Sequence, residues 1–169
     1  MSYIKNKIDW CLKKAERELE KGEKHRGIIE IKPDLEKARE YIEKAEHYLK
    51  ATEYLKKGNF SDISASTIFY SIYHCFLAII TKFGFESKNQ ECTLALMYSL
   101  IEDGKIDFKE EMLEKIASFH TEKDMEQTSL GIREKYQYGT NLSIKENLYQ
   151  ELLDLAKEVI SITKEEIEK

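Results

Sequence analysis

A histidine and two tyrosines cluster in the most apolar segment of the sequence. Tyr70, Tyr73 and His74 fall within residues 61–83, where Tyr70 and His74 share one face of the expected helix and Tyr73 lies on another. A histidine can donate or accept a proton near neutral pH. The cluster is therefore a candidate site within a helical bundle or at a dimer groove. The alternative is a buried histidine that only makes a hydrogen bond to a neighbour.

A second candidate segment, IREKYQYGTN, combines an arginine with two tyrosines. Arg133 could bind phosphate, because a planar guanidinium can donate two parallel hydrogen bonds to phosphate oxygens. Many acidic residues lie nearby in the sequence, so a salt bridge is an equally open interpretation. Tyr136 and Tyr138 could stack on a base, or they could pack against the protein.

Other histidines and the cysteines offer little further chemistry. His120 would need to lie close to Arg133 to act with it, and otherwise it is an exposed histidine at a helix end. The four histidines and three cysteines show no ligand spacing such as C-x-x-C or H-x3-H. The sequence therefore predicts no metal site and no cofactor.

Apolar residues recur with helical periodicity along most of the chain. Proline occurs once and glycine seven times, which leaves room for long helices. The expected fold is an all-α, antiparallel up-and-down bundle of about five to six helices joined by short loops. The expected helices span residues 3–21, 34–57, 61–83, 91–102, 108–120 and 143–167.

Some boundaries and connections can be predicted as well. Ser61 or Asp62 can cap the third helix, and Ser143 with Glu146 forms a capping box for the last one. Residues 28–32 are expected to be extended or irregular. Residues 85–90 are expected to be a polar loop.

Composition suggests a single domain with a small charge asymmetry. The 169 residues carry a net charge of −5, with a slight basic excess in the first third and an acidic excess in the last. The basic third could meet nucleic acid or could be an ordinary solvated surface. The odd number of cysteines fits three thiols in a reducing compartment, and the N-terminus does not resemble a signal peptide. We therefore expect a cytoplasmic protein without a membrane partner.

Three segments of the sequence resemble the HEPN domain family. They are SDISASTIFYSIYHCFLAIITKFGFESKNQ in the third expected helix and beyond, AREYIEKAEHYLKAT in the second, and REKYQYGT before the last. The resemblance covers about residues 33–167. It divides the chain into an N-terminal helical extension, residues 1–32, and a HEPN-like bundle, residues 33–169.

The resemblance implies a helical bundle that often dimerises and often sits beside a minimal nucleotidyltransferase in toxin–antitoxin pairs. Many members are metal-independent endoribonucleases that use an arginine followed, after four to six residues, by a histidine. Here Arg133 is followed after four residues by Tyr138, and a tyrosine is a poor general base at neutral pH. Some family toxins are nucleotidylated on a tyrosine near this motif, which makes Tyr138 a candidate acceptor.

These observations predict a HEPN-like component of a prokaryotic toxin–antitoxin or defence pair. It would bind RNA, a nucleotide or a nucleotidyltransferase partner, and the incomplete motif argues against ribonuclease activity. The alternative is a noncatalytic homodimeric interaction module built on the third and last helices. The catalytic candidates are Arg133, Tyr138 and His74, and the candidate binding groove is lined by Tyr70, Tyr73 and Tyr136.

Overall fold

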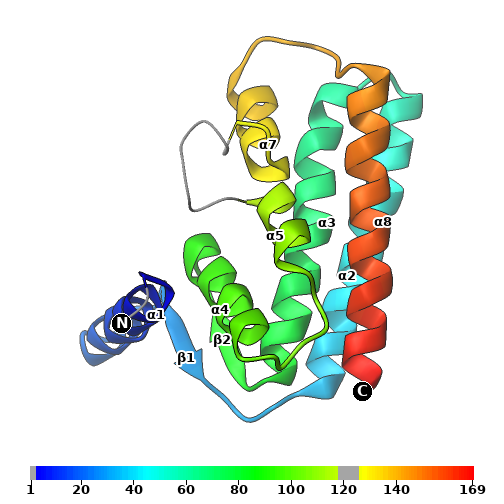
Figure 1. The fold of residues 1–169 in the computed structure, drawn as a ribbon. Coiled ribbons are helices and arrows are strands. Elements are labelled where there is room, and N and C mark those ends of the chain that lie inside the picture. Colours follow the sequence, from blue (N-terminus) through cyan, green and yellow to red (C-terminus); the bar gives the residue numbers. More distant parts are fainter. Residues whose placement is uncertain (1–2, 118–125) are drawn as a thin grey trace.

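The computed structural model describes residues 3–117 and 126–169, and helices dominate both segments (Figure 1). The expected all-α bundle is confirmed. Within the described residues the helices and strands are α1 (Tyr3–Glu20), β1 (Ile28–Glu30), α2 (Leu35–Lys57), α3 (Ser61–Lys82), β2 (Phe85–Ser87), α4 (Gln90–Glu102), α5 (Glu110–Ile116), α7 (Ser129–Tyr138) and α8 (Glu146–Glu168).

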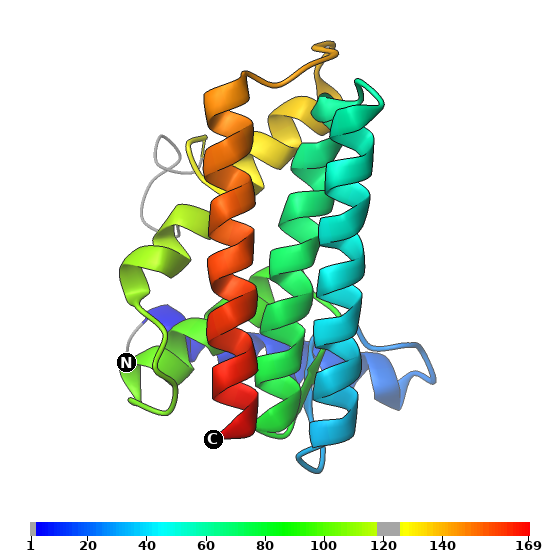
Figure 2. The same cartoon turned by 90° about the vertical axis from the view of Figure 1, so that its right-hand side faces the viewer.

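The three longest helices, α2, α3 and α8, lie side by side as the main body of the molecule (Figures 1 and 2). Helix α2 runs antiparallel to the other two. Ion pairs between α2 and α8 fix this arrangement at both ends, from Lys56 to Glu146 and from Arg39 to Glu168. The chain returns from the end of α3 through α4, α5 and α7, so α8 runs in the same direction as α3.

Helix α3 is the centre of the hydrophobic core. It packs against α2, α8, α7 and α4, and its buried side chains point in all directions around the helix axis. Its length and mean hydropathy are also those of a membrane-spanning helix, but 67% of its most apolar window is buried inside the bundle. This burial is typical of the core helix of a folded domain.

Two predicted helix caps are wrong, one at α3 and one at α8. Phe60 is the N-cap of α3, and Ser61 uses its Oγ to accept a hydrogen bond of 3.1 Å from the backbone N–H of Ile144. Helix α8 begins at Glu146 after Lys145, so Ser143 does not form a capping box. The contact between Ser61 and Ile144 ties the start of α3 to the α7–α8 connection.

The connections contain structure that the sequence pattern did not indicate. Part of the expected loop at residues 85–90 is strand β2, which pairs antiparallel with β1, with Ile29 opposite Glu86. Helix α7 lies in a segment to which no element was assigned, and the expected helix at residues 108–120 is the shorter α5. Strands of three residues are too short for an alternating pattern to be recognised.

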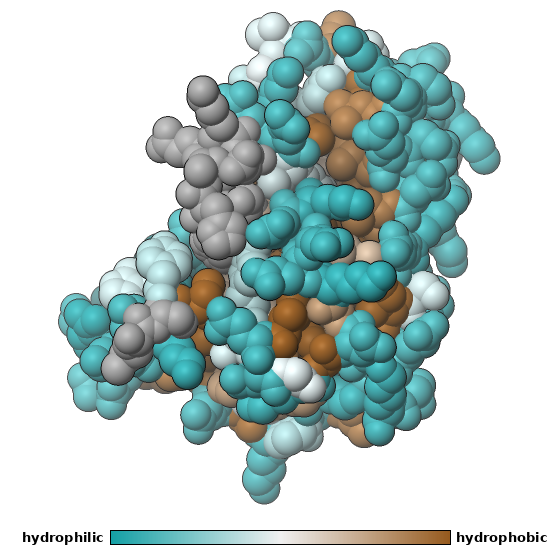
Figure 3. Space-filling view, in the orientation of Figure 1, coloured by the Kyte–Doolittle hydropathy of each residue, from teal (hydrophilic) through white to brown (hydrophobic). Residues whose placement is uncertain are grey.

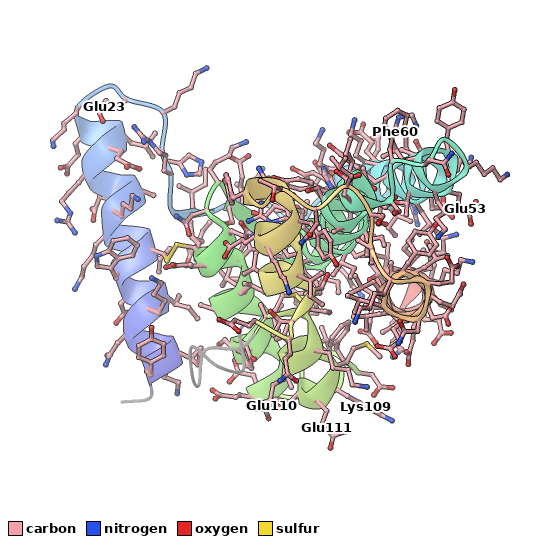
Figure 4. All side chains as sticks on the ribbon, turned by 90° about the horizontal axis from the view of Figure 1, so that it is seen from above. Glu23, Glu53, Phe60, Lys109, Glu110 and Glu111 are labelled. Atoms are coloured by element: carbon pink, nitrogen blue, oxygen red, sulfur yellow. A yellow bond between two sulfur atoms is a disulfide. The ribbon has the colours of Figure 1, made fainter. Side chains whose placement is uncertain are left out.

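The prediction of three free thiols is also wrong. Cys11 in α1 and Cys92 in α4 form a disulfide, which is the yellow bond between these two helices in Figure 4. Cys75 is a free thiol inside the core, where burial raises its pKa to about 12. Helix α1 is thus attached covalently to α4, and β1 of the N-terminal segment pairs with β2 of the bundle.

Candidate functional site: an arginine against aromatic rings

Arg133 lies on the face of α7 that packs against α3. Helix α7 is anchored there by the buried side chains of Leu130 and Ile132. The Arg133 side chain is only 8% exposed, and its guanidinium carbon lies 5.1 Å from the ring centre of Phe69 and 5.8 Å from that of Tyr70. A guanidinium over aromatic faces is attracted by their negative electron density, which fixes its position.

Among residues 3–117 and 126–169, few groups compensate the charge of Arg133. Nη1 donates to the Tyr70 hydroxyl at 3.3 Å, and Nη2 lies 3.3 Å from the carboxylate of Glu134, a neighbour whose own side chain is half exposed. The buried Nε has no hydrogen-bond partner in the part of the chain that the structure describes. Buried ionic donors normally have close partners, so the unpartnered Nε distinguishes this arginine from one in an ordinary buried ion pair.

Tyr70 connects Arg133 to His74 one turn along α3. The Nδ1 atom of His74 lies 2.7 Å from the backbone carbonyl oxygen of Tyr70. The Tyr48 ring, from α2, stacks on His74 at 5.1 Å and lies 5.9 Å from the Tyr70 ring. His74 and Arg133 are therefore parts of one cluster, separated by the rings of Tyr70 and Tyr48.

The chemistry of His74 follows from this contact. A carbonyl oxygen can only accept, so Nδ1 carries the proton and Nε2 keeps the lone pair. Burial lowers the pKa of His74 below its ordinary value; the hydrogen bond to Tyr70 acts in the opposite direction, and the nearby charge of Lys44 lowers it. The ring is therefore neutral at pH 7 and suited to stacking.

The rings form a continuous surface on the α2–α3 side of the molecule, with Arg133 at one edge. Tyr41 lies 6.1 Å from His74, and Tyr73 stacks on Phe69 at 6.2 Å and shares a hydrogen bond of 3.1 Å with Thr93 of α4. We call this the aromatic surface and define it as Tyr41, Tyr48, Tyr70, Tyr73 and His74.

Two lysines of α2 flank the aromatic surface. Lys44 lies 5.5 Å from the Tyr48 ring centre, and Lys37 lies 5.7 Å from that of Tyr41 while also pairing with Glu40 at 2.7 Å. The residues that α2 contributes to this site were not identified from the sequence. Their signal was present, because Lys37, Tyr41, Lys44 and Tyr48 recur every three to four residues and so share one helix face.

The structure brings some of the predicted site residues together and leaves others apart. Tyr136 is half buried against the core, one turn after Arg133 on the same side of α7. Tyr138 is 78% exposed, and five residues of helix turn it about 140° away from Arg133. Arg133 and Tyr138 therefore do not face one ligand, and His120 lies outside the described residues.

The lowered pKa of His74 has a measurable consequence for stability. The unfolded chain takes up a proton at higher pH than the folded chain, so the free energy of unfolding should fall as the pH drops below 6.5, until the folded ring is also protonated. NMR titration of the ring should give a midpoint below 6.5. A midpoint at or above that value would contradict the buried, neutral ring, and His74→Gln should remove this part of the pH dependence.

The fold and the site together define an all-helical bundle with a buried arginine set against aromatic rings. A protein-family model described as HEPN domain matches residues 38–167. The match spans nearly all of α2 to α8 and leaves α1 and β1 outside. The chain belongs to the HEPN domain family, and this membership indicates a helical module with a nucleotide- or RNA-related role. A search of curated proteins finds no match.

Proposed function

We propose that the protein binds single-stranded RNA across the aromatic surface, with Arg133 holding a backbone phosphate. The observation that carries this proposal is the buried guanidinium of Arg133. Within the described residues its Nε has no partner, and its paired carboxylate, on Glu134, is half exposed. A phosphate would supply the missing acceptor and charge, and arginine binds phosphate through parallel hydrogen bonds.

The neighbouring rings support RNA over a free nucleotide as the ligand. Base stacking on aromatic side chains is tolerant of sequence, and single-strand sites combine it with positive charge along the backbone. A row of rings extends from Arg133 across α3 and along α2, and Lys44 lies beside it. The row consists of Tyr70, Tyr48, His74 and Tyr41. This row is longer than one base requires, so a strand should bind more tightly than a mononucleotide.

Within the family, the proposed role is that of a component of a prokaryotic toxin–antitoxin or defence pair, with a minimal nucleotidyltransferase as a possible partner. Binding rather than cleavage is proposed, because Tyr138 points away from Arg133 and is a poor base. Incubating the folded protein with total RNA, without metal, should leave the RNA intact. Fragments that disappear with an Arg133 variant would overturn this part of the proposal.

Replacing Tyr48 with alanine should weaken RNA binding about tenfold, because loss of one stacking ring costs roughly 1–3 kcal/mol. Fluorescence anisotropy with a short single-stranded RNA measures this directly. Tyr54→Ala is the matched control, since Tyr54 is on the same helix, is 78% exposed and lies outside the aromatic surface. Equal affinities for the wild type and Tyr48→Ala would exclude the aromatic surface as the RNA site.

A second candidate function, a noncatalytic homodimeric interaction module, rests on exposed apolar side chains at one end of the bundle. Phe60 lies at the α2–α3 end in Figure 4, and Figure 3 shows apolar residues reaching the surface in the seam between α7 and α8. Light scattering of the purified protein distinguishes the candidates, because this function requires a stable dimer that RNA does not alter. The exposed residues are Tyr54, Phe60, Ile63, Tyr138 and Leu142.

A further inference from the structure

The N-terminal helix α1 is attached to the bundle by the Cys11–Cys92 disulfide and by a small set of packing contacts. It lies outside the residues that match the family, and its main neighbours are α4 and β1. Only Cys11 and Ala15 are fully buried among its 18 residues, and Cys11 is the residue that bonds to Cys92. Burial of so few side chains gives α1 a small non-covalent contribution to its attachment.

The packing around α1 is incomplete on one side and tight on the other. A shallow, open groove runs over the second half of α1 and β1, lined by side chains that include Leu12, Leu19 and Ile29. Near the disulfide, in contrast, a Cβ on Gly27 would lie 2.1 Å from the carbonyl oxygen of Cys11. The tightest backbone contact of α1 is therefore at the turn that carries the disulfide, while Ile4, Ile8 and Leu12 pack partly buried against the core.

Helix α1 covers an apolar surface of α4. Residues 92–98 of α4 are all buried. Seven consecutive residues of a helix point in every direction around its axis, so α4 is covered on all sides along this stretch. One of those directions faces α1, and the exposed ion pair between Lys7 and Glu91 lies beside it. Detachment of α1 would expose that apolar side of α4 to water.

We propose that the Cys11–Cys92 disulfide is a redox latch, and that its reduction releases α1 while the α2–α3–α7–α8 bundle stays folded. A dithiol reductant supplies the two electrons and two protons. Its thiolate attacks one cysteine sulfur, which breaks the S–S bond, releases the other cysteine as a thiol and forms a mixed disulfide. The reductant's second thiol then attacks the reductant sulfur of that mixed disulfide and displaces the first cysteine, leaving two cysteine thiols and the oxidised, cyclic reductant. Both sulfurs are buried, so attack requires local opening of α1, which its few buried contacts permit.

Reversible opening of the Cys11–Cys92 bond fits this chain because the bulk of the hydrophobic core lies in the bundle and not in α1. Most of the core around α3 comes from the rest of the bundle, and α1 adds Cys11 and the partly buried side chains of Ile4, Ile8 and Leu12. The proposal does not rest on RNA binding, because neither cysteine belongs to the aromatic surface.

The test is amide hydrogen exchange of the full chain, followed by mass spectrometry, with and without dithiothreitol. Reduction should speed exchange in residues 3–20 at least tenfold and leave α2, α3 and α8 unchanged. Unchanged exchange in α1 would show that the disulfide is not its anchor. Faster exchange throughout the chain would show that reduction unfolds the whole domain, and either result would overturn the latch.

Variants separate the latch from a general effect of the reductant. The double variant Cys11→Ser, Cys92→Ser should reproduce the reduced pattern without dithiothreitol, and Cys75→Ala should respond to dithiothreitol as the wild type does. Alkylation of the denatured, unreduced chain should label Cys75 alone. Labelling of Cys11 and Cys92 there would show that the bond does not form.

Discussion

Arg133→Met should lower the affinity for single-stranded RNA at least tenfold. Methionine keeps much of the length and apolar contact of the arginine with Phe69 and Tyr70 but removes the positive charge and all donors. Loss of one phosphate contact should also reduce the slope of log affinity against log salt by about 0.7, the value for single strands. Anisotropy titrations at several salt concentrations measure both effects.

The same variant should not destabilise the fold. A buried charge with an unpartnered Nε is costly, and replacing such a group by an apolar side chain of similar size is often neutral or stabilising. Urea unfolding of Arg133→Met should therefore give a midpoint at or above that of the wild type. The matched control is Arg39→Met, an exposed arginine paired with Glu168, which should bind RNA normally. Loss of stability together with full RNA affinity would make Arg133 a structural residue.

Phe76→Ala should lower the free energy of unfolding by about 3–5 kcal/mol, the usual cost of truncating a fully buried phenylalanine. Phe76 is 1% exposed on α3, and its ring meets the edge of Phe108 at 6.0 Å, so the cavity would open at the centre of the core. A domain of this size has a total stability of about 5–15 kcal/mol, so the variant should be close to unfolding.

Urea denaturation followed by circular dichroism measures this loss. Phe60→Ala provides the matched control, because Phe60 is 54% exposed at the start of the same helix and should change the free energy of unfolding far less. Similar decreases in the free energy of unfolding for Phe76→Ala and Phe60→Ala would contradict the central position of α3.

The sequence predicted the helices well because their cause is local. Periodic apolar residues in 34–57, 61–83 and 143–167 predicted α2, α3 and α8 within a few residues of their observed ends. The helix caps were predicted wrongly because tertiary contacts decide them. Ser61 has the right chemistry for a cap, but its oxygen accepts instead from Ile144, which is distant in the sequence.

The site was predicted only in part, because some of its residues come together only through tertiary packing. Arg133, Tyr70 and His74 were identified from their types, and the structure places them in one cluster. Tyr48 was not identified, because its role depends on how α2 packs against α3. The Cys11–Cys92 pair has a sequence separation of 81 residues, so only the contact of α1 with α4 reveals it.

The most direct test of RNA binding at the aromatic surface is photo-cross-linking of the wild-type protein to single-stranded RNA, with the linked peptides identified by mass spectrometry. Binding at this surface should give cross-links on Tyr48, Tyr70 or His74, and these should be lost when unlabelled single-stranded RNA competes. Cross-links confined to α1 or α8, or none from protein shown to be folded, would contradict it.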